Sequence, residues 1–369
     1  MSTSKVYFTD MRSSAKENLL AKVVRLADML DLKQIVPSRG LVAIKLHFGE
    51  KGNTAYLRPT FVRQIVDRVR ALGALPFLTD ANTLYVGTRA DSVSHLHTAV
   101  ENGFSFSVVN APLIIADGLR GGSYAAVKIQ QEVVKTAYVG KEIAEADGLI
   151  SLAHFKGHEL SGFGGTIKNL GMGCASRRGK MVQHADVSPK IARKKCVGCG
   201  ECVEHCSQSA IALREEKAAI DPKKCIGCGE CLLICSSKAI DVQWNADMAL
   251  FQKKMAEYTL AVLKGKEGRV AFLNFLTQIS PACDCYGHSD APIVHDLGIV
   301  ASVDPVAIDQ ASVEMVNRQR ALEGTSLAAN KNPGEDKFGA LYPKVDWSVQ
   351  LEHAEKIGLG SREYELVTI

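Results

Sequence analysis

Apolar and polar residues follow two alternating patterns along most of the chain. Short apolar runs, typical of buried strands, are separated by segments in which apolar residues recur every three or four positions, as on one face of a helix. The expected strands are residues 5–9, 41–48, 75–79, 104–116 (with a turn), 147–155 and 270–279. The expected helices are residues 18–32, 59–72, 91–102, 246–263 and 305–318. Because strands and helices alternate, the pattern predicts an α/β fold with an open, mostly parallel sheet.

Two runs of four cysteines interrupt this alternation. Both have the spacing C-x2-C-x2-C-x3-C, with glycines where the loop must bend closely. The runs are Cys196, Cys199, Cys202 and Cys206, then Cys225, Cys228, Cys231 and Cys235. Zinc would also accept four cysteines, but the doubled triple run exceeds its needs, and disulfides require an oxidising compartment. The spacing therefore predicts two [4Fe-4S] clusters.

The cysteine stretch resembles the two-cluster ferredoxin domain of the bacterial type. In such ferredoxins the fourth cysteine of each run ligates the other cluster, so the resemblance implies crossed ligation. One cluster would take Cys196, Cys199, Cys202 and Cys235, and the other Cys225, Cys228, Cys231 and Cys206. The family usually has proline after the fourth cysteine, where this chain has Ser207 and Ser236, and serine still permits the turn.

Helices and strands of the α/β pattern occur on both sides of the cysteine runs. The ferredoxin-like α+β module is therefore expected to be inserted into a host domain. The expected parts are residues 1–188 for the first part of the host, 189–242 for the two-cluster insert and 243–369 for the second part of the host.

The net charge and the cysteine count restrict the partners. The formal charge of +4 falls to about zero once eight thiolates and two cluster cores are included, so we expect no nucleic-acid partner. The first residues lack a secretory signal, and no apolar stretch is long enough to span a bilayer. A reducing, cytoplasmic location and no membrane contact are therefore expected. Arg193, Lys194 and Lys195 are either a solvated charge run or a surface that steers an acidic redox partner.

Polar residues cluster where three of the expected strands end. The segments are residues 45–53, 80–83 and 154–169. In an open parallel sheet, ligands bind beyond the carboxyl ends of the strands. We therefore expect a pocket there for a small anionic substrate, with a glycine-rich loop at residues 161–166 that offers amides to the anion. The candidate catalytic residues are Lys156, His158, Lys168 and His47.

The segment 154–180, HFKGHELSGFGGTIKNLGMGCASRRGK, resembles the DUF362 family of uncharacterised iron–sulfur proteins. VDPVAID at residues 303–309 and the segment 45–47 extend the resemblance, which covers about residues 5–320. It implies the same pairing of an α/β domain with a ferredoxin insert.

Two further metal sites are considered. His154 and His158 are four residues apart, so on a helix they could share a metal, although a single histidine is more often a hydrogen-bonded part of the scaffold. Cys283 and Cys285 would point to one side of an extended backbone. With Cys174 or His288 they are candidates for a third metal centre, and the alternative is three reduced thiols.

These features predict a cytosolic redox protein that carries electrons through two clusters to a site in the α/β domain. It would be a reductase acting on an anionic substrate, an electron carrier that docks a partner enzyme, or a non-redox binding protein with structural or sensing clusters. No dinucleotide fingerprint follows the first strand, so the expected electron donor is a redox partner protein, either a ferredoxin or an oxidoreductase.

Overall fold

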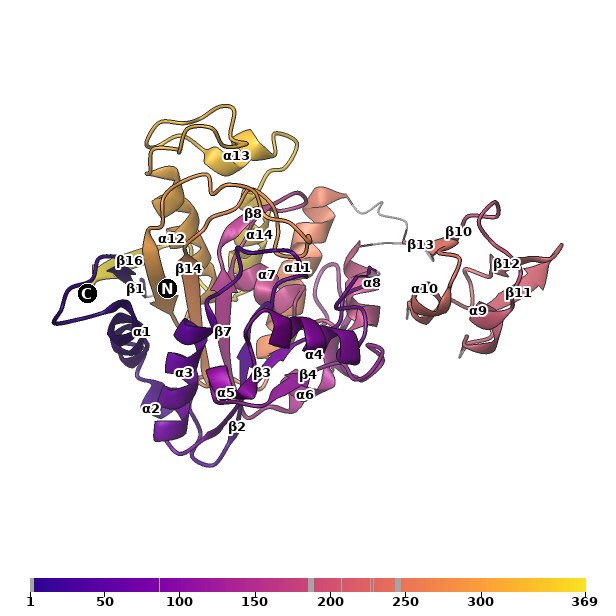
Figure 1. The fold of residues 1–369 in the computed structure, drawn as a ribbon, viewed down its shortest axis with the longest axis horizontal. Helices are drawn as coiled ribbons and strands as arrows, with labels where there is room; N and C mark the ends of the chain where they lie inside the picture. Colours follow the sequence, from indigo (N-terminus) through magenta and orange to yellow (C-terminus); the bar gives the residue numbers. More distant parts are fainter. Residues whose placement is uncertain are drawn as a thin grey trace.

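Eight strands form one twisted sheet in the larger lobe of the molecule (Figure 1). The computed structural model describes residues 3–85, 87–184, 189–206, 208–225, 227, 229–242 and 247–369, apart from the side chain of Leu233. The strand order is β16-β1-β15-β14-β7-β2-β3-β4. Their bounds are β1 Ser4–Asp10, β2 Leu41–Lys45, β3 Leu75–Asp80, β4 Leu113–Ile115, β7 Gly148–His154, β14 Val270–Leu276, β15 Gly298–Ser302 and β16 Tyr364–Thr368.

The five strands β14, β7, β2, β3 and β4 are mutually parallel, whereas β15 runs antiparallel to both of its neighbours. The prediction of an α/β fold with a mostly parallel sheet is confirmed. Because β7 precedes the cysteine runs and β14 follows them, both halves of the chain contribute to this one sheet.

Helices cover both faces of the sheet and bury its alternating side chains. Along β2, Ala43 packs into the core on one face, while Val42 and Ile44 pack into the core on the other. The first face is covered by α7 (Thr166–Gly171), α11 (Met248–Leu263), α12 (Pro305–Asn317) and α14 (Ser348–Lys356). The second is covered by α1 (Leu19–Asp28), α2 (Leu32–Ile35), α3 (Pro59–Ala71) and α5 (Phe106–Val109).

Most expected elements are present with shifts of a few residues, and one is wrong. Residues 104–116 form the short helix α5 followed by the three-residue strand β4, instead of one strand with a turn. The helix ends at Asn110, whose φ of 58° lies in the left-handed region. The loops also carry α4 (Ser92–Glu101), α6 (Lys141–Glu145), α13 (Lys337–Leu341), and the hairpin of β5 (Tyr124–Lys128) with β6 (Thr136–Gly140).

The described residues between 189 and 242 form a smaller lobe and add no strand to the large sheet (Figure 1). It contains β10 (Lys190–Ile191) paired with β13 (Ile240–Asp241), and β11 (Ile211–Arg214) paired with β12 (Lys217–Ile220). The helices α9 (Glu201–Glu204) and α10 (Glu230–Ile234) follow the second cysteine position of each run and contain the third, Cys202 or Cys231. The pairing of β10 with β13 brings the two ends of this cysteine lobe together.

Deletion of residues 189–242, with the ends joined by a short glycine–serine linker, is expected to leave the large sheet folded. Leu84 and Met181 of the larger lobe would lose apolar partners in the cysteine lobe, which lowers stability by ~2–4 kcal/mol and the melting temperature by about 5–10 °C. Circular dichroism melting of the deletion variant checks this. A product without a cooperative transition would mean that the two lobes depend on one core.

No helix in the described part of the chain is both long and apolar enough to cross a membrane.

Candidate functional site

A cavity of about 470 Å³ lies beyond the carboxyl ends of β2, β3 and β7. Its walls come from the loops after these strands, from α7 and α8 (Arg177–His184), from Phe251 of α11, and from a turn at residues 283–286. All four candidate residues line this cavity: His47, Lys156, His158 and Lys168. The polar segments that follow separate strands in the sequence thus meet at one site.

Positive charge predominates among the described residues of the cavity wall. Five cationic side chains face two carboxylates, Asp80 and Glu159. The cations are Lys45, Arg89, Lys156, Lys168 and Lys180, and all five are buried. Three of these cations already have buried carboxylate partners: Lys45, Arg89 and Lys156. Lys168 and Lys180 are therefore the cations best placed to attract a small anion, because little water remains to screen them.

Asp80, the last residue of β3, organises one side of the cavity. Its carboxylate lies 3.0 Å from Lys45 Nζ and 3.5 Å from Arg89 Nη1. Burial alone would raise the pKa of Asp80, but the charge of Lys45 and its other neighbours lowers it well below the usual range. Arg89 Nε also lies 3.1 Å from Glu50 Oε2, so both lysine and arginine are held in place by buried ion pairs.

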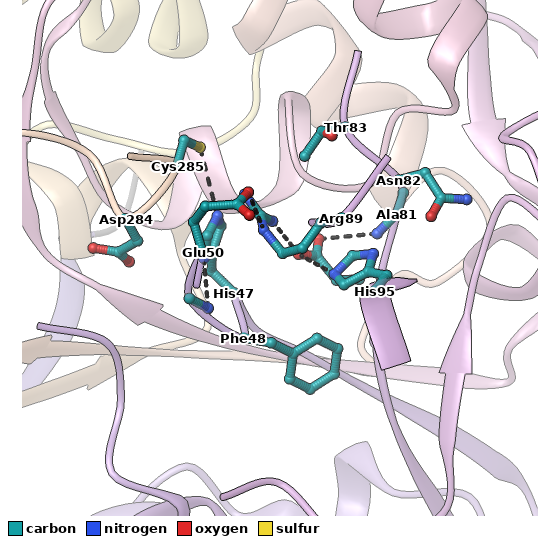
Figure 2. A network of polar contacts seen from close by, with 12 residues as sticks. His47, Phe48, Glu50, Ala81, Asn82, Thr83, Arg89, His95, Asp284 and Cys285 are labelled. Carbon is teal, nitrogen blue, oxygen red and sulfur yellow. Dashed lines mark hydrogen bonds and ion pairs between the residues drawn. The ribbon is translucent and has the colours of Figure 1, made fainter. Parts of the chain in front are cut away.

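His47 is oriented by the loop after β2. The amide of Gly49 donates to His47 Nδ1 (3.0 Å), so Nε2 carries the proton of the neutral ring, and Nε2 lies 3.5 Å from Cys285 Sγ (Figure 2). Burial lowers the pKa of His47. Gly49 has a φ of 82°, and a Cβ there would collide with Tyr56, so the loop requires glycine.

The idea that His154 and His158 share a metal from one helix is wrong. His154 ends β7, and His158 ends β8 (Lys156–His158), which forms a hairpin with β9 (Gly162–Gly164). His154 Nδ1 lies 2.7 Å from Asp284 Oδ1, whereas His158 Nδ1 lies 2.8 Å from Ser161 Oγ. The apolar run of β7 favours an extended chain up to His154, and β8 is extended as well. The two rings are therefore not on one helix face, and each has its own partner.

The glycine-rich loop does not offer its helix amides to a substrate. Gly165 precedes α7, and the amides of Thr166 and Ile167 donate to the Asp309 carboxylate at 2.7 and 2.9 Å. Burial raises the pKa of Asp309 to about 6. The VDPVAID segment therefore caps α7 and occupies the Thr166 amide, and residues 161–166 do not line the cavity, so the expectation that this loop binds the anion there is wrong. Lys168, one turn later, does reach the cavity.

The three cysteines outside the runs are not gathered at one point. Cys174 is buried in the core of the sheet, and its thiol lies 3.8 Å from the Asn169 carbonyl oxygen. Cys283 and Cys285 occupy a turn closed by the Tyr286 amide donating to the Cys283 carbonyl (3.1 Å), not an extended strand. Within the described ranges, no group of three or more His, Cys, Asp or Glu side chains is placed to hold a metal ion, either here or in the two cysteine runs. A third centre, with Cys174 or with His288, stays a prediction.

The two cysteine runs adopt matching backbone geometry. Cys196 and Cys225 each donate their amide to a carbonyl four residues earlier. The amides of Ala210 and Ala239 each donate to the sulfur of a fourth cysteine, Cys206 or Cys235, at 3.2 Å. A small cavity is lined by Cys196, Cys199, Cys202 and Cys235. Of the other predicted set, Cys206, Cys225 and Cys231 are partly buried, and Cys228 lies outside the described residues.

The second cysteine run lies against the wall of the larger cavity. Leu84 lines that cavity and belongs to the same apolar cluster as Cys196 and Cys202. A Cβ added at Gly229, between the cysteines of the second run, would lie 3.4 Å from Leu84 Cδ1. The cysteine lobe and the cationic cavity therefore share a wall.

Lys180 is a cavity residue that the sequence analysis missed. It lies on α8, which the sequence pattern does not indicate, and its Nζ donates to the Ala175 carbonyl (2.6 Å). Burial lowers the pKa of Lys180 to about 8, although Asp117 opposes the shift. The lysine sits in the segment 154–180, but nothing in its spacing distinguishes it from a surface lysine.

Acetic anhydride is expected to acetylate Lys180 with a midpoint near pH 8. Only the neutral amine reacts, and the lowered pKa lets Lys180 become neutral at a lower pH than an ordinary lysine. Ordinary lysines lose their proton near pH 10.4. Peptide mass spectrometry over a pH series checks this, with exposed Lys141 as the internal control. Identical pH profiles for the two lysines would contradict it.

Three comparisons relate the chain to known proteins. Residues 42–314 match the family described as "Domain of unknown function (DUF362)". No curated protein matches. Among solved structures, the lactate racemase apoprotein from Thermoanaerobacterium thermosaccharolyticum is similar, with a TM-score of 0.37 and 14% identity, over 73% of this chain and 50% of that one, so this chain spans about half of its length. Because the matched segment covers most of the chain, the protein belongs to the DUF362 family, as its segments 154–180 and 303–309 predicted.

Proposed function

We propose that this protein is an iron–sulfur reductase that passes electrons from its cysteine lobe to a small anionic substrate in the cationic cavity. The observation that carries the proposal is the shared wall at Leu84, where a cavity with five buried cations meets the second cysteine run. Electron transfer requires the cysteine lobe to contact the cavity, and an anionic substrate is attracted by the positive charge of the cavity wall.

The donor set of the cysteine lobe fits two [4Fe-4S] clusters with crossed fourth ligands. Four cysteines, Cys196, Cys199, Cys202 and Cys235, surround one small cavity. Backbone amides point at the sulfurs, including Ala218 N to Cys196 Sγ (3.4 Å), as is common around iron–sulfur clusters. Cys225, Cys228, Cys231 and Cys206 would hold the second cluster. When bound, the clusters supply single-electron transfer.

The outer side of the cysteine lobe suits electron uptake from a partner protein. Cys199 is exposed, and the adjacent Val197 is 68% exposed. Lys194 and Lys195 lie nearby and are also exposed, so an acidic ferredoxin or oxidoreductase would be attracted to this surface.

The cavity suits a small, negatively charged molecule. Its volume of about 470 Å³ falls at the lower end of the range for ligand pockets. Lys168 and Lys156 would orient the anion, and Lys180, whose pKa is lowered to about 8, would donate or accept a proton near neutral pH.

Anaerobic reduction followed by mixing with a panel of small carboxylates and oxyanions tests the proposal. The accepted substrate is expected to oxidise the reduced protein catalytically, which visible absorbance follows. Oxidation only by a partner protein, with no small anion active, would favour the electron carrier. Centres that cannot be reduced would favour structural or sensing clusters.

A further inference from the structure

We propose that Cys283 and Cys285 form a redox-active thiol pair in the cavity wall, and that the substrate class is a small organic disulfide bearing carboxylates. The inference deepens the proposed reductase function, and it rests on that function for the supply of electrons. It starts from a thiol pair that neither cluster requires.

The turn at residues 283–286 places the two sulfurs together. The Cys285 amide donates to Cys283 Sγ (3.4 Å), and the two thiols are close enough that each shifts the pKa of the other, upward for Cys283 and downward for Cys285. A dithiol this close can exchange between the reduced pair and an internal disulfide without a large movement of the chain.

The two cysteines have unequal access to the cavity. Cys285 lines the cavity, whereas Cys283 is 1% exposed and lies behind it. This is the arrangement of an attacking thiol and a resolving thiol, because a substrate can reach only Cys285. The sulfur of Cys174, buried elsewhere in the core, has the Asn169 carbonyl oxygen as its neighbour at 3.8 Å.

Polar groups beside the pair favour a thiolate at Cys285, whose pKa is lowered, while that of Cys283 is raised. Lys168 Nζ donates to Cys283 Sγ at 2.9 Å, and His47 Nε2 lies 3.5 Å from Cys285 Sγ. A positive charge or an N–H donor next to sulfur stabilises the thiolate, which is the nucleophile. The same lysine, with Lys156 and Arg89, would attract the carboxylates of the substrate.

The turn is held from several sides. The Asp284 carboxylate lies 2.7 Å from His154 Nδ1 and 3.1 Å from Lys156 Nζ. The Glu50 amide donates to the Asp284 carbonyl (3.1 Å), and the Tyr85 hydroxyl donates to the Cys285 carbonyl (2.9 Å). These contacts keep the thiol pair in a fixed position for attack.

The reaction balances in three steps. The Cys285 thiolate attacks one sulfur of R–S–S–R, a Cys285–S–R bond forms, the substrate S–S bond breaks, and RS⁻ leaves and takes a proton. Cys283 sulfur then attacks Cys285 Sγ, loses its proton, and releases the second RS⁻, which leaves two RSH and a Cys283–Cys285 disulfide. Two electrons from a reduced iron–sulfur donor, delivered through the cysteine lobe, and two protons restore the dithiol.

The test uses the full-length protein with dithiodiglycolate, a small dianionic disulfide, and bis(2-hydroxyethyl) disulfide, a neutral one of similar size. Under anaerobic conditions, mass spectrometry is expected to show that Cys283 and Cys285 together lose two hydrogens as they form a disulfide. This loss should be at least about tenfold faster with the dianionic disulfide than with the neutral one. Cys283→Ser should trap a mixed disulfide on Cys285, Cys285→Ser should not react, and Cys174→Ser should behave as the wild type. No reaction at residue 285, or equal rates with both disulfides, would overturn the proposal.

A second experiment distinguishes the thiol pair from the proposed delivery of electrons through the cysteine lobe. The oxidised protein receives a one-electron donor protein, and thiols are counted with an alkylating reagent. Recovery of two thiols in the wild type but not in Cys235→Ser supports both proposals. Thiol exchange without recovery would contradict electron delivery through the lobe and leave the thiol pair supported.

Discussion

Replacement of Cys235 by serine is expected to remove the cluster whose other ligands are Cys196, Cys199 and Cys202, although Cys235 belongs to the other run. The reason is spatial, because all four side chains line one small cavity. We expect loss of about half of the iron and sulfide, and loss of one of two EPR signals, with a fall of at least about tenfold in electron transfer to the cavity. Anaerobic purification with iron and sulfide counts checks this.

Cys174→Ser is the matched control, because Cys174 is a buried cysteine outside the lobe. It should retain all of the iron. Cys206→Ser is the reciprocal variant and should affect the other cluster. If Cys235→Ser instead disturbed the cluster of Cys225 and Cys231 alone, the crossed assignment would be wrong.

Lys168→Met is expected to weaken the binding of the substrate anion by about 10–100-fold, since a hydrogen bond between charged groups contributes roughly 1.5–3 kcal/mol. Lys168 lines the cavity, and burial removes competing water. Titration calorimetry with the anion that oxidises the reduced protein measures the change.

Two variants make the Lys168 result specific. Lys168→Arg keeps the charge and should recover much of the affinity. Lys356→Met removes an exposed lysine that pairs with Glu132 and should leave the affinity unchanged. Equal affinities for the wild type and Lys168→Met would contradict an anion site at this lysine.

The sequence predicts β14, β7, β2 and β3 well, because each is an apolar run followed by a polar segment, whereas β4 is only the last part of the strand expected at residues 104–116. The same pattern brings His47, Lys156, His158 and Lys168 to one cavity. The apolar run of β15 was not assigned to a strand, and its antiparallel direction is set only by its pairing with β1 and β14. The edge strand β16 was missed because its half-buried residues form a strand only through their pairing with β1.

The errors at the site also have physical causes. The loop at residues 161–166 looks like an anion-binding loop until Asp309, more than a hundred residues later, occupies its amides. His154 and His158 have helical spacing, but the chain between them is extended. Lys180 was overlooked because its burial, which lowers its pKa to about 8, depends on contacts with distant elements.

The proposed function requires the cysteine lobe to hold two redox-active clusters. The most direct measurement is an iron and sulfide count on protein purified without oxygen, together with EPR of the reduced form. Two [4Fe-4S] clusters would give about eight irons and eight sulfides per chain and two magnetically interacting centres. Zinc in place of iron, or iron centres with no EPR change on reduction, would contradict the account.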